Sequence, residues 1–200
     1  MPKENFYNLP EKKRNLILEA IKKEFEEHSI KDASVKDIVE ALGISRGSFY
    51  TYFKNLEESY FTILERETIE FHEIFLKLFR RENGNLFKAL DFFGQELAKE
   101  LFKKEKYALY KNRYLYWTPD LAALWREFHM ENRHVNSLEM DVAFKQVEDG
   151  RMKEFMHYIK AVVHELIRRS FLENWSQEIF LEHYEKQISW VKYGLKDILE

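Results

Sequence analysis

A short run of hydrogen-bond donors between residues 46 and 52 is the part of this sequence best suited to contact another molecule. The run Arg46-Gly47-Ser48-Phe49-Tyr50-Thr51-Tyr52 contains a guanidinium group and several hydroxyls but no carboxylate. Donors of this kind bind phosphate oxygens and the edges of bases. A glycine inside a helix costs about 1 kcal/mol relative to alanine, so Gly47 indicates close approach of another molecule. The run therefore predicts a surface that contacts nucleic acid.

The residues around this run predict two short helices joined by a tight turn, over about residues 33–52. Ser34 and Ser45 can cap the two helices, and Gly43 suits the left-handed residue that ends the first one. Apolar residues recur at helical spacing on one face of each helix: Val35, Ile38, Val39 and Leu42, then Phe49 and Phe53. This is the helix-turn-helix layout. A plain helical hairpin inside an all-α protein has the same pattern.

Length and composition favour an all-α protein with a small N-terminal domain joined to a larger one. The chain has 200 residues, of which 45% are hydrophobic and 16% aromatic, enough for a packed core. Three prolines and six glycines interrupt it, and it has no cysteine, which excludes disulfides and thiolate metal sites. No apolar run approaches the length of a membrane span. We expect a cytoplasmic protein without a membrane partner.

The charge distribution by itself does not indicate a nucleic-acid partner. The formal net charge is −3, and residues 1–56 carry ten Lys and Arg against nine Asp and Glu. Affinity for DNA must therefore come from local placement of donors rather than from a basic domain.

Two helices are expected to brace the helix-turn-helix and to connect it to the rest of the chain. The first runs from Pro10 to about His28, with Leu16, Ile17, Ala20, Ile21 and Phe25 as its buried stripe. The second is a long helix from the cap Asn55 to Arg81, which would be a rigid connection without a linker. We expect a helix-turn-helix domain at residues 10–70 and a second helical domain at residues 71–200.

The middle of the second domain is rich in aromatic residues, after a helix expected at Leu86 to Lys104. Pro119 can begin a further helix that runs to around Phe144. An aromatic wall with convergent hydroxyls is typical of a pocket for a small molecule, although a bulky core is an equal alternative. The candidate ligand-binding residues are Tyr107, Tyr110, Tyr114, Trp117 and Trp125.

The last two helices, expected at Arg151 to about Glu173 and from Ser176 to about Ile198, carry wide apolar stripes. Two such helices could pair with the same two from a second copy and form a four-helix interface. They could instead simply complete the core of one chain. The candidate interface residues are Phe155, Ile159, Val162, Leu166, Tyr184, Ile188, Val191 and Leu195.

Residues 10–70 resemble the TetR family of bacterial transcriptional regulators. The resemblance rests on the run from Ile17 to Phe25, on the segment Ser34-Val-Lys-Asp-Ile-Val-Glu-Ala-Leu-Gly-Ile-Ser-Arg-Gly-Ser-Phe-Tyr-Thr-Tyr-Phe53, and on the helix that follows. It implies a homodimer that binds double-stranded DNA at a palindromic operator and responds to a small-molecule effector. The C-terminal part resembles the family in architecture only.

The resemblance also implies roles for single residues. Arg46 would reach base edges or phosphate, Tyr50 would give its hydroxyl to a phosphate, and Gly47 would allow close approach to the groove. The family usually has a lysine at the position of Leu56, so Lys54 either substitutes for it or the contact is missing. The full set of expected DNA-binding residues is Ser34, Lys36, Arg46, Gly47, Ser48, Tyr50, Thr51, Tyr52 and Lys54.

Two other classes of protein remain open at this point. The patterns Glu131-Asn-Arg-His134 and Glu154-Phe-Met-His157 have the spacing of ligands in di-metal carboxylate enzymes of the four-helix-bundle type. No apolar helix offers the two further carboxylates, so we expect no catalytic residue, metal or cofactor. A dimeric structural protein without DNA binding is the other class. We favour a ligand-responsive DNA-binding regulator, a repressor released from its operator by a small apolar or aromatic effector.

Overall fold

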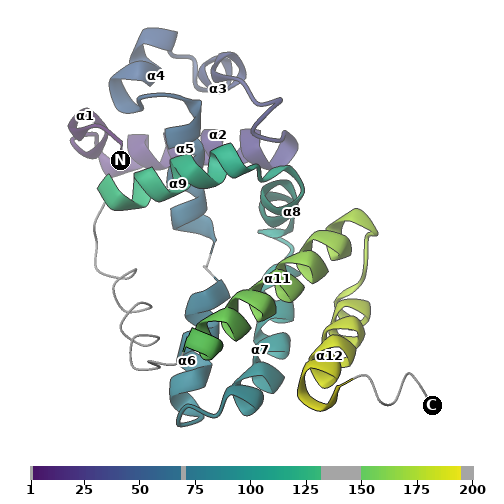
Figure 1. Ribbon diagram of the computed structural model, residues 1–200. Coiled ribbons are helices and arrows are strands. Elements are labelled where there is room, and N and C mark those ends of the chain that lie inside the picture. The colour runs from purple at the N-terminus through teal and green to yellow at the C-terminus, as the bar shows by residue number, and fades with distance from the viewer. Residues whose placement is uncertain (1, 69–70, 132–149, 195–200) are drawn as a thin grey trace. The chain divides into compact units, whose positions relative to one another are not determined.

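The computed structural model describes residues 2–68, 71–131 and 150–194, and all regular structure in these ranges is helical (Figure 1). The expected all-α class is confirmed. By packing, the chain forms two compact units: Met1–Thr68 with Lys104–Arg133, and Ile69–Lys103 with His134–Glu200. Residues 104–133 thus pack with the N-terminal helices. The domain boundaries at 10–70 and 71–200 stay a prediction. Among the described helices, none combines the length and the apolar character that crossing a bilayer requires.

The N-terminal unit contains a helix-turn-helix braced by longer helices. In Figure 1, α3 and α4 form one end of this unit and α2 runs across it. The α2 helix contacts α3, α5 and α8, and α9 packs against α5. The helices of this unit are α1 (Glu4–Tyr7), α2 (Glu11–Glu27), α3 (Val35–Leu42), α4 (Arg46–Tyr52), α5 (Leu56–Glu67), α8 (Tyr107–Tyr116) and α9 (Pro119–Glu131).

The bracing helix α2 forms where expected but buries a different stripe from the one predicted. Leu16, expected inside, is 59% exposed, whereas Leu18 is buried beside Ile17, Ile21 and Phe25. The reason is that α3, α5 and α8 all pack against α2, which turns the buried face towards Leu18. The Asn112 side chain on α8 holds the C-terminal end of α2 by donating to carbonyl oxygens, including that of Phe25 at 2.9 Å.

The predicted long helix from Asn55 to Arg81 is wrong, because it is two helices. Asn55 does cap α5 by accepting from the Glu58 amide, but α5 ends at Glu67 and α6 spans Phe71–Arg81. Thr68 has extended backbone angles (φ −111°, ψ 151°) and donates its hydroxyl to the Leu64 carbonyl oxygen. The buried Arg113 donates to the same hydroxyl at 3.0 Å. A β-branched residue that bonds its own backbone competes with helix continuation, which accounts for the end of α5 at Glu67.

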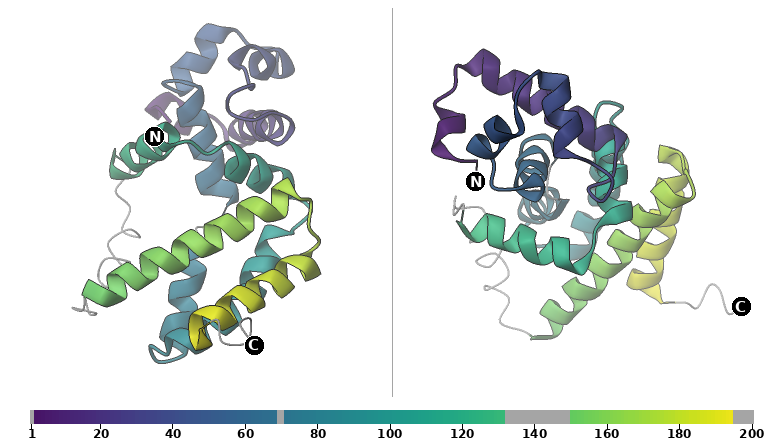
Figure 2. Two further views of the ribbon diagram at one scale, coloured as in Figure 1. Left: turned by 45° about the vertical axis from the view of Figure 1, so that its right-hand side comes forward. Right: turned by 90° about the horizontal axis from the view of Figure 1, so that it is seen from above.

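The C-terminal unit contains α6, α7 (Leu86–Leu101), α11 (Gly150–Leu172) and α12 (Gln177–Tyr193). The α7 helix packs against α6 and α12, and α11 runs beside α12 (Figure 2). Asn85 and Ser176 cap α7 and α12 by accepting from backbone amides. The expected seam of α12 extends to Ile198, but Gly194 follows the helix with a φ of 82°, and Leu195 and Ile198 lie outside the described residues.

A glycine of α7 and a tyrosine of α12 fit closely together. A Cβ atom at Gly94 would lie 2.4 Å from two ring carbons of Tyr184. The Tyr184 hydroxyl donates to the Leu90 carbonyl oxygen at 2.8 Å, and its ring contacts Phe93 and Phe180. Burial raises the pKa of this hydroxyl well above its usual range. The ring is therefore held from both sides and has no room to move.

We expect the substitution Gly94→Ala to destabilise the protein by about 1–3 kcal/mol, because overpacking a filled core costs that much. This range is the net cost, after subtracting the gain of about 1 kcal/mol that alanine has over glycine in helix propensity. Chemical denaturation of the two proteins measures the difference. A Gly94→Ala variant as stable as the wild type would contradict this packing.

Candidate nucleic-acid interface

The first helix of the helix-turn-helix has the end geometry that its sequence predicts. Ser34 Oγ accepts from the Asp37 amide at 3.1 Å and donates to the Asp37 carboxylate at 2.6 Å. Gly43 ends α3 with φ 62° and ψ 34°. This left-handed conformation strains residues that have a Cβ, so the glycine sets the tight turn into α4.

A buried carboxylate that the sequence pattern does not single out joins α2 to this motif. Glu24 is 7% exposed and accepts from the backbone amide of Ser34 at 2.8 Å. It thereby fixes the start of α3 against the bracing helix. Glu24 follows the buried stripe of α2 by helical spacing, which was the only signal in the sequence.

The second helix, α4, is the candidate reading helix. Ser45 Oγ accepts from the Ser48 amide at 3.1 Å, which confirms the predicted cap. Phe49 and Phe53 are fully buried, with ring centroids 5.3 Å apart, as expected for the inward stripe. The two phenylalanines anchor one face of α4 in the core and leave the opposite face outward.

The outward face of α4 carries the expected donors. Arg46, Gly47, Tyr50 and Thr51 are exposed, while Ser48 and Tyr52 are half-buried. The Thr51 hydroxyl donates to the Gly47 carbonyl oxygen at 2.9 Å, and the hydroxyls of Ser45 and Ser48 are 3.0 Å apart. Within the described part of the chain, no hydrogen bond occupies the Arg46 guanidinium or the Tyr50 hydroxyl. These two groups are the donors most ready for an external acceptor.

The two lysines before and after α4 that were expected to contact DNA are exposed, whereas Leu56 is packed. Lys36 is exposed and 3.8 Å from the Glu40 carboxylate, and Lys54 is exposed directly after α4. Leu56 packs against the core of the N-terminal unit, so its side chain is committed to packing. The cations of this motif are therefore exposed side chains, one in the first turn of α3 and one directly after α4.

Two family models match separate parts of the chain. Residues 86–194, more than half of the chain, match the model described as "Tetracyclin repressor, C-terminal domain". Residues 17–58 match the model described as "Bacterial regulatory proteins, tetR family". The chain belongs to the TetR family. It is therefore a transcriptional regulator of this family, whose members bind DNA through a helix-turn-helix.

A crystal structure of a TetR family transcriptional regulator from Chloroflexus aurantiacus J-10-FL is similar to the chain at 17% identity. The alignment covers 91% of this chain and 97% of that one, with a TM-score of 0.45. No curated protein sequence matches the chain. The assignment to the TetR family accordingly rests on the two family models.

The aromatic residues predicted to bind a ligand have different surroundings in this TetR family chain. Trp117 and Trp125 pack edge to face, with ring centroids 6.1 Å apart, and both contact Phe61 in the core of the N-terminal unit. Tyr110 is fully buried, whereas Tyr107 and Tyr114 are half-buried. Both tryptophans have packing partners inside the chain, and the ligand assignment stays a prediction.

The residues predicted to form the dimer interface are similarly divided. Ile159, Leu166, Tyr184 and Ile188 are buried within the single chain and complete its own core. Phe155, Val162 and Val191 are half-buried, and Leu195 lies outside the described residues.

The two Glu-x-x-His patterns do not gain further ligands in the part of the chain that the structure describes. His134 lies outside it, and Glu154 and His157 are both exposed on α11. The described residues contain no group of three or more His, Cys, Asp or Glu side chains that could hold a metal ion.

At Gly47 the fold leaves room for a side chain, whereas the predicted DNA contact does not. A Cβ atom at this position would meet only Ser45 Oγ, at 3.7 Å, which is an ordinary contact. We expect Gly47→Ala to leave the fold as stable as before or up to about 1 kcal/mol more stable. The same substitution should weaken DNA binding, because the added methyl group lies on the outward face of α4. Denaturation and DNA titration of one protein preparation measure both effects, and unchanged DNA affinity would count against close approach at Gly47.

Proposed function

We propose that this regulator is a homodimeric repressor that binds a palindromic operator and is released from it by a small apolar or aromatic effector. The observation that carries the proposal is the outward face of α4, a helix capped by Ser45. Arg46 and Tyr50 are exposed there, and among the described residues no hydrogen bond occupies the guanidinium or the hydroxyl. Membership of the TetR family supports DNA as the partner.

The weak overall charge of the chain suits a specific rather than a purely electrostatic contact. With a net charge of −3, the protein has little general attraction for phosphates. Arg46 can form two hydrogen bonds to a guanine edge, and the Tyr50 hydroxyl can donate to a phosphate. In a dimer, two copies of α4 would enter successive major grooves about one helical turn apart.

We expect Arg46→Ala to weaken operator binding by about 1–3 kcal/mol per protomer, because a base or phosphate contact of arginine is lost. Tyr50→Phe should weaken it less, because only a hydroxyl is removed. The probe is a duplex that the wild-type protein selects from a random-sequence library, and fluorescence anisotropy measures the affinity.

Tyr116→Phe is the matched control, since Tyr50 and Tyr116 are both 46% exposed and Tyr116 lies on α8. It should bind the duplex as the wild type does. If Arg46→Ala retains wild-type affinity while its thermal melting is unchanged, α4 is not the reading helix.

The effector part of the proposal rests on the half-buried tyrosines of α8. Tyr107 and Tyr114 combine an apolar ring with a hydroxyl, a common lining of small-molecule sites. Burial raises the pKa of the Tyr107 hydroxyl above its usual value. A planar or bulky apolar effector fits these groups best. Binding of such a molecule would favour a dimer geometry whose spacing no longer matches the operator.

The dimer part of the proposal rests on apolar residues of α11 and α12 that stay exposed or half-buried in the part of the chain that the structure describes. Tyr158 is 56% exposed and lies on α11 at helical spacing between the half-buried Phe155 and Val162. On α12, Ile179 is 42% exposed and Val191 is half-buried. Two such helices can pair with the same face of a second copy around a two-fold axis.

We expect Tyr158→Glu to convert the dimer to a monomer at micromolar concentration, because a carboxylate would be buried at the interface. Lys160→Glu is the control: Lys160 is exposed on the other side of the same helix, and its charge changes by more. Sedimentation velocity measures the oligomeric state. A dimeric Tyr158→Glu variant would place the interface elsewhere.

A further inference from the structure

The chain begins with a structured segment that lies before the residues matched by the N-terminal family model. That model matches residues 17–58, whereas α1 spans Glu4–Tyr7. Phe6 of this helix is 2% exposed and belongs to the core of the N-terminal unit. The ring of Phe6 lies 5.1 Å from that of Phe53 and 6.2 Å from that of Tyr52. The segment is thus packed against the C-terminal end of α4.

Lys3, the residue before α1, makes two hydrogen bonds to this end of α4. Its backbone amide donates to the Tyr52 carbonyl oxygen at 2.8 Å, and its ammonium donates to the Tyr50 carbonyl oxygen at 2.6 Å. The last carbonyl groups of a helix have no partner inside the helix. The Phe49 carbonyl oxygen accepts from the Phe53 amide, and Lys3 provides donors for Tyr50 and Tyr52.

The ammonium of Lys3 remains available to a second partner. It is exposed, and one bond to a neutral carbonyl oxygen leaves its positive charge in place. A lysine ammonium has three donors. By contrast, the Lys36 ammonium lies within ion-pair distance of the Glu40 carboxylate. The α4 helix has no basic residue in its own last turn, so Lys3 places a cation beside the turn that carries Tyr50, Thr51 and Tyr52.

We propose that Lys3 is a DNA-binding residue, which closes the C-terminal end of α4 with one proton and binds a backbone phosphate with another. The proposal rests on the proposed function, since it needs α4 to be the reading helix. It assigns the N-terminal segment to the DNA-binding surface. A cation at the end of a recognition helix contacts a phosphate rather than a base edge, so Lys3 contributes to affinity and not to sequence choice.

The test measures how the affinity depends on salt, since each phosphate contact of a cation steepens that dependence. The probe is again the duplex that the wild-type protein selects from a random-sequence library. For Lys3→Gln, we expect the slope of log K against log salt to become shallower by about 0.9 per protomer, or about 2 per dimer. Lys3→Arg should keep the wild-type slope, because it retains a cation that can reach both partners.

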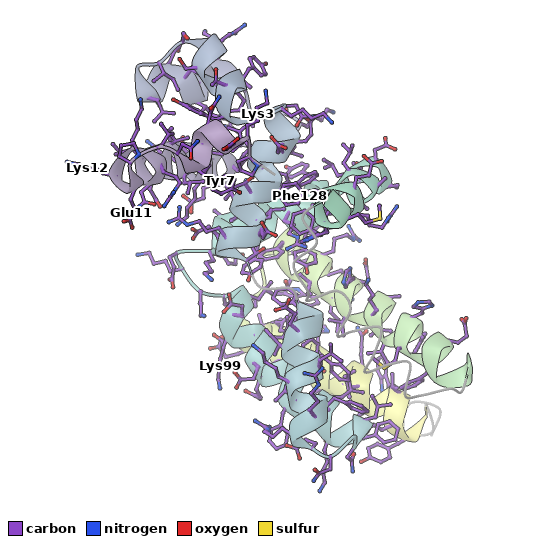
Figure 3. All side chains as sticks on the ribbon, turned by 90° about the vertical axis from the view of Figure 1, so that its left-hand side faces the viewer. Lys3, Tyr7, Glu11, Lys12, Lys99 and Phe128 are labelled. Carbon is purple, nitrogen blue, oxygen red and sulfur yellow. The ribbon has the colours of Figure 1, made fainter. Side chains whose placement is uncertain are left out.

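Lys12→Gln is the matched control, with the same change of charge at an exposed lysine in the first turn of α2, away from Lys3 (Figure 3). It should keep the wild-type slope. Thermal melting of all three variants separates a loss of folding from a loss of contact.

Three results would overturn the proposal or its basis. If Lys3→Gln binds more weakly but keeps the wild-type slope, Lys3 acts only as a cap and binds no phosphate. An equal change of slope in Lys12→Gln would show a general effect of net charge. If the wild-type protein selects no duplex, the proposed function itself fails, and the contact of Lys3 with DNA fails with it.

Discussion

The candidate reading helix is too short to be stable by itself, and much of the N-terminal unit packs against it or bonds its ends. The α4 helix has seven residues, fewer than an isolated helix needs for stability in water. The Ser45 hydroxyl accepts a hydrogen bond from an amide at the N-terminal end of α4, and Lys3 donates to a carbonyl oxygen at its C-terminal end. Two phenylalanines anchor its inner face in the core. Core packing holds the inner side of α4, and hydrogen bonds to backbone groups hold both of its ends. The outward side needs neither and carries polar residues. The proposed DNA-binding surface is thus a consequence of how a short helix is supported.

The same principle extends from α4 to its neighbours. The start of α3 is tied to α2 through the buried Glu24, and the end of α2 is tied to α8 through Asn112. Each of these links uses a side chain to satisfy backbone groups at a helix end. Residues 104–133 therefore belong to the N-terminal unit by packing, even though they fall within the residues matched by the C-terminal family model.

Thr68 decides where α5 ends, and it is the last residue of the first segment of the N-terminal unit. Its extended backbone ends α5, and its hydroxyl bonds both the Leu64 carbonyl oxygen and the Arg113 guanidinium. Apolar residues keep helical spacing across this point, which is why a single helix was expected there. Hydrophobic periodicity reports which faces are buried but not whether the backbone between them is continuous. A tertiary hydrogen bond to a side chain 45 residues away cannot be read from local spacing.

The sequence alone determined the features that depend on local chemistry. The caps at Ser34 and Ser45, the left-handed Gly43 and the buried pair Phe49 and Phe53 follow from neighbouring residues, and the structure shows each of them. Tertiary structure decided which side of α2 is buried, where α5 ends, and that Trp117 and Trp125 pack against Phe61. It also decided that residues as far apart as Lys3 and Tyr50 meet. These outcomes depend on contacts between distant segments, whose energies are not encoded in the spacing of any one helix.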